Sequence, residues 1–249
     1  MALVNYSVAD GVAHVEINRP EAANAFDLAT AREFAAAVAQ AGADDAVRVV
    51  LVTGAGKRFC AGGDVASFVD APEPADHLLV LATELDAAFR ALADLAKPVV
   101  AAVQGAVAGA GLGLLLSADV AVASPETKFV FAYPGIGATP DCGVSYLLPR
   151  AVGQQRALQF ALIGRPLGAE EAREWGLVAE VDESAHERAA ALAAQFAAGP
   201  ALALGQARRL IRASADRSRA EIGADEARTI AASVSTDESQ ALIKAFLKR

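Results

Sequence analysis

The sequence predicts an α/β fold followed by a helical C-terminal region. Short β-branched apolar runs alternate with stretches of helical spacing through most of the chain, which is typical of strands and helices packed in layers. From Glu183 onward the residues favour helix, apart from a break at Gly199-Pro200. A chain of 249 residues with 54% hydrophobic content is large enough to bury a sizeable core.

The first expected elements are a hairpin, a helix and a buried strand. Leu3 to Asn18 alternates apolar and polar residues around Asp10-Gly11, which is a hairpin signal. Leu28 to Ala41 has helical spacing and a high alanine content. Val47 to Thr53 is a β-branched apolar run that ends in a tight glycine loop, so it predicts a buried strand.

The same order of helix, strand and loop then returns. Leu78 to Leu95 predicts a long amphipathic helix, which Lys97-Pro98 breaks. Val99 to Val103 predicts a strand, and Gly105 to Gly111 is a glycine-rich loop that enters a helix over Leu114 to Ser117. Later elements are strands at Asp119 to Ala123 and Phe129 to Phe131, an irregular loop over Pro134 to Gly143, and a helical region from Tyr146.

Charge and composition exclude several classes of protein. The net charge of −8 argues against nucleic acid as a partner, because a phosphate backbone requires clustered Lys and Arg. The apolar stretch from Val99 to Leu116 is interrupted by Gln104, so no membrane span is expected. The start of the chain has no signal-peptide pattern, which predicts a cytoplasmic protein. Cys60 and Cys142 are too few for a disulfide framework or a zinc site, so no metal is expected.

Two loops of small residues carry the most information about chemistry. Arg58-Phe59-Cys60-Ala61-Gly62-Gly63-Asp64 presents backbone N–H groups after a predicted strand, although alone it is also typical of a glycine turn with positive φ. Gly105 to Gly113 leads into an apolar helix, and a helix N-terminus has free N–H donors that can stabilise an oxyanion. The glycines do not have the spacing of a dinucleotide-binding loop.

Together with Lys97 to Val103, Ser117-Ala118-Asp119 and Arg173 to Val178, these loops resemble the crotonase (enoyl-CoA hydratase/isomerase) superfamily in order and separation. The resemblance covers nearly the whole chain, from Asn18 to the closing residues Ala245 to Arg249. It implies a crotonase-type spiral of ββα turns over residues 1–190, which binds acyl-CoA and performs the chemistry. It also implies a C-terminal helical trimerisation layer over residues 191–249, and hence a homotrimer or a dimer of trimers.

The resemblance implies the parts of the site as well. The N–H groups of Gly63 and Ala110 would form an oxyanion hole around a thioester carbonyl. Coenzyme A would bind as part of the substrate, with no further cofactor, along the residues Ala23, Ala25, Ala61, Gly62, Asp64 and Val65. Lys57, Arg19, Arg58, Lys248 and Arg249 are candidates for its phosphates. Asp64 is expected to stabilise its own loop through an Asx-type bond to neighbouring amides.

The acid and base residues distinguish the reactions of the superfamily. Hydratases of this kind use two glutamates, and the matching positions are Gly113 and Tyr133, neither of which is a carboxylate. Asp141 lies in a segment similar to that of phenylacetate-pathway ring-epoxide isomerases and related enoyl-CoA isomerases, in which the aspartate moves a proton. The same residue could instead start a turn or cap a helix. Dehalogenation is disfavoured, because Asp86 occupies the position of the dehalogenase histidine.

The resemblance therefore predicts an enoyl-CoA isomerase with Asp141 as acid and base. The acyl pocket is expected to be lined by Phe68, Gly113, Phe131, Tyr133 and Tyr146. Two alternatives stay open, an atypical enoyl-CoA hydratase and a member of the family that binds acyl-CoA without catalysis.

Overall fold

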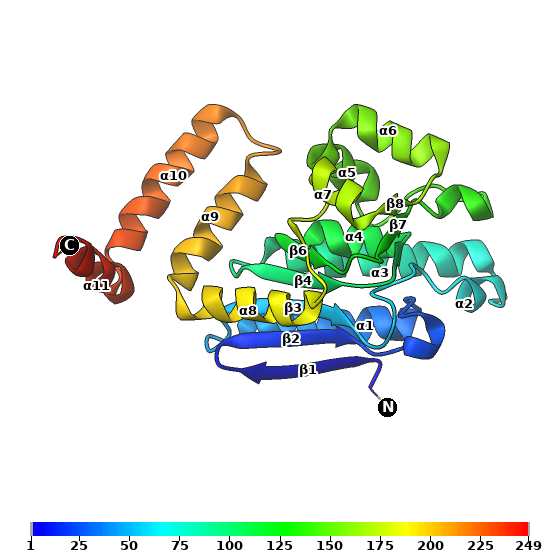
Figure 1. Ribbon diagram of the computed structural model, residues 1–249, viewed down its shortest axis with the longest axis horizontal. Coiled ribbons are helices and arrows are strands. Elements are labelled where there is room, and N and C mark those ends of the chain that lie inside the picture. Colours follow the sequence, from blue (N-terminus) through cyan, green and yellow to red (C-terminus); the bar gives the residue numbers. More distant parts are fainter. Residues whose placement is uncertain (1, 249) are drawn as a thin grey trace.

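The chain folds around a six-stranded sheet and a smaller three-stranded one in a computed structural model that describes residues 2–248 (Figure 1). The larger sheet has the order β1-β2-β3-β4-β6-β9, and the smaller has the order β5-β7-β8. Strands of the larger sheet are β1 (Val4–Ala9), β2 (Val12–Ile17), β3 (Val49–Gly54), β4 (Val99–Val103), β6 (Val120–Ala123) and β9 (Glu180–Val181). Those of the smaller sheet are β5 (Ala106–Ala108), β7 (Lys128–Val130) and β8 (Leu167–Gly168).

The predicted hairpin is confirmed, and the other strand pairs of the larger sheet are parallel. β1 and β2 pair antiparallel in the register Val4 to Ile17, and Asp10 and Gly11 both have positive φ at the turn between them. The neighbouring pairs from β2 to β9 are parallel. Parallel strands need crossover connections, which the long helices between them provide.

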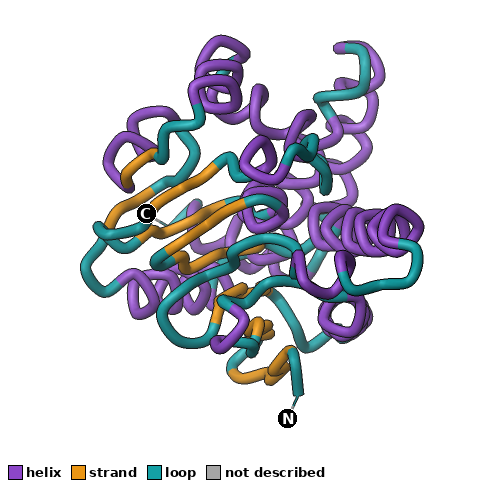
Figure 2. Tube along the Cα trace, turned by 90° about the vertical axis from the view of Figure 1, so that its right-hand side faces the viewer, coloured by secondary structure: helices purple, strands orange, loops and turns teal. Residues whose placement is uncertain are grey.

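Helices cover both faces of the larger sheet, and alternate residues of each strand point to opposite faces. Val50 and Val52 of β3 pack into the cluster with α1 (Leu28–Ala43) and α3 (Pro74–Asp94). Val49 and Leu51 pack into a second cluster with α8 (Ala185–Ala198). Figure 2 shows the strands lying between these layers of helix.

The remaining helices follow the strands or form the C-terminal region. They are η1 (Pro20–Ala22), α2 (Val65–Val69), α4 (Ala110–Ser117), η2 (Tyr133–Ile136), α5 (Val144–Val152), α6 (Gln154–Ile163), α7 (Ala169–Trp175), α9 (Ala201–Ala213), α10 (Arg219–Val234) and α11 (Asp237–Phe246). In Figure 1, α10 and α11 extend away from the sheets. No helix within residues 2–248 is both long enough and apolar enough to cross a membrane.

Several element boundaries differ from the sequence expectation. α3 begins at Pro74 rather than at residue 78, because proline is well suited to the first turn of a helix. The glycine-rich segment after β4 contains strand β5, and α4 begins at Ala110 rather than at residue 114. The expected boundary between residues 190 and 191 falls inside α8, which packs on the sheet.

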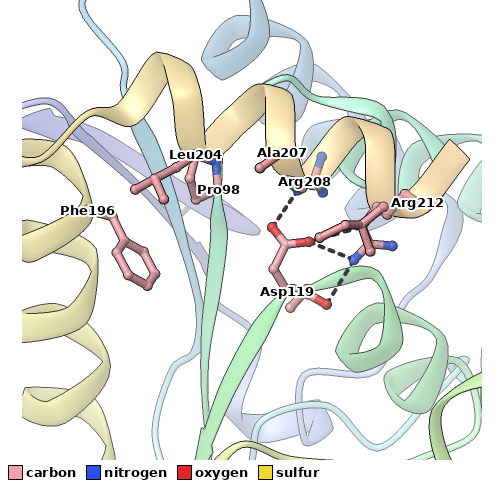
Figure 3. Close-up of a pocket in the computed structure, with 9 residues that line it drawn as sticks. Pro98, Asp119, Phe196, Leu204, Ala207, Arg208 and Arg212 are labelled. Atoms are coloured by element: carbon pink, nitrogen blue, oxygen red, sulfur yellow. Dashed lines mark hydrogen bonds and ion pairs between the residues drawn. The ribbon is translucent and has the colours of Figure 1, made fainter. Parts of the chain in front are cut away.

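An ion-pair cluster attaches the C-terminal helix α9 to the end of the sheet (Figure 3). Arg208, which is only 7% exposed, donates to the carboxylate of Asp119 and to the backbone carbonyls of Leu92 and Leu95. Arg212 donates to the other oxygen of Asp119 at 3.0 Å. Asp119 also accepts from the backbone N–H of Val99 at 2.8 Å, so one carboxylate joins α9 to the start of β4.

Replacing Asp119 by alanine is expected to lower the free energy of unfolding by about 3–5 kcal/mol, because it leaves the buried Arg208 guanidinium without its counter-charge. Urea denaturation measures the change. The exposed Glu174 serves as control, and Glu174→Ala should change stability by no more than about 0.5 kcal/mol. A loss below about 1 kcal/mol for Asp119→Ala would show that the cluster does not hold α9.

Candidate active site

A chamber of about 570 Å³ lies where the two small-residue loops meet α2, α3 and the segment from Ala132 to Asp141. The first loop contributes Ala61, Gly62 and Gly63 to its wall. Gly109 and Ala110, at the start of α4, line it from the other loop. The two loops that the sequence singled out, more than 40 residues apart, therefore meet at one site.

Both backbone amides expected to form an oxyanion hole lie at this wall. Within residues 2–248, neither the N–H of Gly63 nor that of Ala110 donates a hydrogen bond to the protein. A Cβ placed on Gly62 would lie 3.1 Å from the Ala108 carbonyl and 3.5 Å from the Ala110 nitrogen, so the two loops touch. Ala110 is also the first residue of α4, and the positive end of a helix dipole favours negative charge there.

Two glycines of α4 allow the backbone of two other segments to pack directly against this helix. A Cβ on Gly111 would overlap the carbonyl oxygen of Cys60, in the first loop. A Cβ on Gly113 would lie 2.6 Å from the carbonyl oxygen of Cys142, next to Asp141. Gly113, which the resemblance matches to a hydratase glutamate, therefore lies against backbone and does not line the chamber, contrary to the expectation for the acyl pocket.

Apolar side chains of α2 and α3 form another part of the wall. α3 contributes Ala75, Leu78, Leu79 and Ala82, whose spacing of i, i+3, i+4 and i+7 places them on one helix face. Val65 and Phe68 of α2 also line the chamber. The α3 face was not predicted as part of the site, although its helical stripe was visible in the sequence.

Asp141 is the sole ionisable carboxylate among the described residues that line the chamber. The hydroxyl of Tyr133 donates to its Oδ1 at 2.8 Å. Burial, and then the nearby Asp141 carboxylate, raise the pKa of Tyr133, so the phenol stays protonated. The Asp141 side chain does not cap α5, whose N-cap is Gly143, while the Asp141 carbonyl accepts from the N–H of Val144 in a turn.

The two cysteines lie behind the loops and are fully or mostly buried. Burial raises the pKa of Cys60 to about 12 and also raises that of Cys142, so both remain thiols near neutral pH. Cys142 has φ of 50° and Gly143 has φ of 74°. A non-glycine residue in this region is strained, which is common next to functional groups.

The segment expected to contact coenzyme A is joined to the first loop. The Ala61 N–H donates to the carbonyl of Ala23 at 3.1 Å. Arg19 donates to the carbonyl of Ala25 at 2.6 Å and to Asp64 at 3.0 Å. The expected Asx-type bond of Asp64 is thus replaced by an ion pair, and Arg19, only 13% exposed, is already occupied and poorly placed for a phosphate.

Other predicted residues lie elsewhere. Phe131 packs against Tyr133 and is not among the residues that line the chamber. Tyr146 lines a separate cavity and donates to Asp216, so neither residue lies where the acyl pocket was expected. Lys57 is exposed and does not line the chamber. Arg249 lies outside the described residues. In residues 2–248, no group of three or more His, Cys, Asp or Glu is arranged to hold a metal ion.

Comparison with known proteins identifies the family. A family model described as enoyl-CoA hydratase/isomerase matches residues 7–249. The chain belongs to the enoyl-CoA hydratase/isomerase family. The expectation from the sequence motifs is therefore confirmed at the level of the family and its crotonase fold.

Individual members of the family are similar over most of the chain. The 1,2-epoxyphenylacetyl-CoA isomerase of Escherichia coli (strain K12) is 40% identical over 82% of this chain and 80% of its own. The trans-2-decenoyl-[acyl-carrier-protein] isomerase of Streptococcus mutans is 39% identical over 72% of this chain and 68% of its own. The crystal structure of enoyl-CoA hydratase/isomerase from Cupriavidus metallidurans CH34 superposes with a TM-score of 0.91 at 32% identity, covering 100% of this chain and 94% of that one.

Replacing Gly113 by alanine is expected to displace the Cys142 backbone and to lower the free energy of unfolding by about 1–3 kcal/mol, because the new Cβ has no room. Denaturation curves and a crystal structure of the variant measure both effects. Gly135 is the matched control, since a Cβ there meets nothing within 4 Å. Equal stability of the two variants would contradict close packing at Gly113.

Proposed function

We propose that this protein is an enoyl-CoA isomerase that moves a double bond, or isomerises a ring, in an acyl-CoA through a thioester enolate. The observation that carries the proposal is that two backbone amides without a hydrogen-bond acceptor in residues 2–248 and a single carboxylate line the same apolar chamber. The chain is similar to two isomerases of the family, one for 1,2-epoxyphenylacetyl-CoA and one for trans-2-decenoyl-[acyl-carrier-protein], and this similarity supports the same class of reaction.

The two amides stabilise the charge that forms in the reaction. When a proton leaves the carbon next to a thioester, negative charge accumulates on the carbonyl oxygen. The Gly63 and Ala110 N–H groups would donate to that oxygen, with the dipole of α4 adding to the effect. Preorganised donors of this kind contribute strongly, and the loss of one typically costs a factor of about 100 or more in rate.

Asp141 then supplies both proton transfers. Its carboxylate would take a proton from C2 of a 3-enoyl thioester, and the electron pair would spread over the dienolate to the carbonyl oxygen. Returning the same proton to C4 moves the double bond to C2–C3 without adding any atom. One carboxylate is therefore sufficient for isomerisation.

The two-glutamate hydration mechanism fits this site poorly. Its glutamate positions match Gly113 and Tyr133, and the space beyond Gly113 is filled by the Cys142 carbonyl. A glutamate introduced at residue 113 would clash with the same Cys142 carbonyl. Hydration would require a water-activating base other than these two positions.

Exposed residues support the proposals for coenzyme A binding and for assembly. Lys57 and Arg58 are exposed at the start of the first loop, which suits them to coenzyme A phosphates. Phe246 and Leu247 are 74% and 78% exposed, and large exposed apolar residues favour contact with another subunit. By the resemblance to the family, we propose a homotrimer or a dimer of trimers as the assembly and the cytoplasm as the location.

Asp141→Asn is expected to reduce isomerisation by about 100-fold or more, because the amide cannot accept and return a proton. Mass spectrometry in deuterated water follows double-bond position, added water and deuterium with 3-enoyl-CoA and 2-enoyl-CoA. The control is Asp216→Asn, an exposed aspartate that also pairs with a tyrosine, and it should retain activity within about threefold.

The other outcomes separate the alternatives. Water addition that survives Asp141→Asn would establish a hydratase with another base. Tight binding of acyl-CoA without turnover in either protein would favour a non-catalytic member of the family.

A further inference from the structure

We infer that Tyr133 is a positioning residue that holds one oxygen of Asp141 and leaves the other free to carry the substrate proton. This inference rests on the proposed function of Asp141. It assigns Tyr133 a role beyond lining the pocket. The hydrogen bond concerned joins two residues that are eight positions apart in the sequence.

The hydrogen bond has a defined direction. Tyr133 Oη lies 2.8 Å from Asp141 Oδ1, and Tyr133 is only 7% exposed. Because burial raises the pKa of this phenol, its proton stays on the oxygen, and the hydroxyl donates. A hydrogen bond to an ionised acceptor is shorter and stronger than one between neutral groups, so it can hold the carboxylate in one orientation.

The tyrosine ring is itself held in place. Phe131 packs edge-on against it at a centroid distance of 5.2 Å, and Phe131 packs in turn on Phe160 at 6.0 Å. Phe160 is buried in the core at 2% exposure. The Tyr133 carbonyl also accepts from the Ala138 N–H at 3.0 Å. The hydroxyl is therefore presented from a fixed position at the chamber wall.

The backbone of Asp141 is fixed from the opposite side. Its carbonyl accepts from the Val144 N–H at 3.0 Å, and the next residue, Cys142, lies against Gly113. With the backbone held there, the remaining freedom of Asp141 is rotation about its side-chain bonds, and the terminal rotation of an aspartate is broad. The Tyr133 hydroxyl is positioned to remove that freedom.

This arrangement makes the two carboxylate oxygens unequal. Oδ1 accepts the Tyr133 hydrogen bond, so Oδ2 is the oxygen that takes the proton from substrate carbon. While the dienolate is bound, the proton remains on Oδ2 and faces the same molecule. Without the tyrosine hydroxyl, the neutral carboxyl group would rotate and exchange its proton with water before returning it.

The test compares Tyr133→Phe with Tyr146→Phe. Residues 2–248 contain a second Tyr–Asp pair, Tyr146 with Asp216, which lines a different cavity. Steady-state kinetics uses 3-enoyl-CoA, and a second assay uses the substrate deuterated at C2 in ordinary water. Tyr133→Phe is expected to lower kcat by about 10- to 100-fold with KM changed by less than about twofold. The fraction of deuterium transferred to C4 of the product should fall as well.

The control should leave kcat, KM and deuterium transfer close to wild type, and melting temperatures show that each variant is folded. A Tyr133→Phe protein with kcat and deuterium transfer within about twofold of wild type, while Asp141→Asn is inactive, would overturn this inference alone. Equal losses in Tyr133→Phe and Tyr146→Phe would also overturn it, since the effect would then not be local. Turnover that does not depend on Asp141 would overturn the proposed function and this inference together.

Discussion

Close packing of backbone against the glycines of α4 is the constraint on which the site depends. Gly111 admits the Cys60 carbonyl and Gly113 admits the Cys142 carbonyl, both at separations that no Cβ would allow. The first contact brings the Gly63 amide beside the start of α4, and the second brings the Asp141 segment against the same helix. Three segments separated widely in sequence thus meet around two turns of one helix.

The same packing explains why the site has one carboxylate. A side chain at residue 113 and the present course of the Cys142 backbone cannot occupy the same space. Tyr133, at the other position matched to a hydratase glutamate, donates a hydrogen bond to Asp141. Two amides and one carboxylate at the same chamber suit the proposed reaction, in which charge and proton move within one bound acyl group.

The sequence was most informative where structure depends on local pattern. Alternation around Asp10-Gly11 predicted β1 and β2, and the apolar run before Gly54 predicted β3. The two glycine loops, which the sequence singled out, both line the chamber. Contacts across irregular segments could not be predicted in this way. Tyr133 and Asp141 lie in a stretch without periodicity, and Tyr146 follows Asp141 closely but is carried by α5 to another cavity.

A crystal structure with a non-reactive acyl-CoA analogue tests the central claim most directly, because it locates the thioester relative to the two backbone amides and to Asp141. The account predicts a thioester oxygen within about 2.7–3.1 Å of both the Gly63 and Ala110 nitrogens, with Asp141 Oδ2 facing C2 and C4 of the acyl group. An acyl group bound elsewhere, or a thioester oxygen that contacts neither amide, would contradict it.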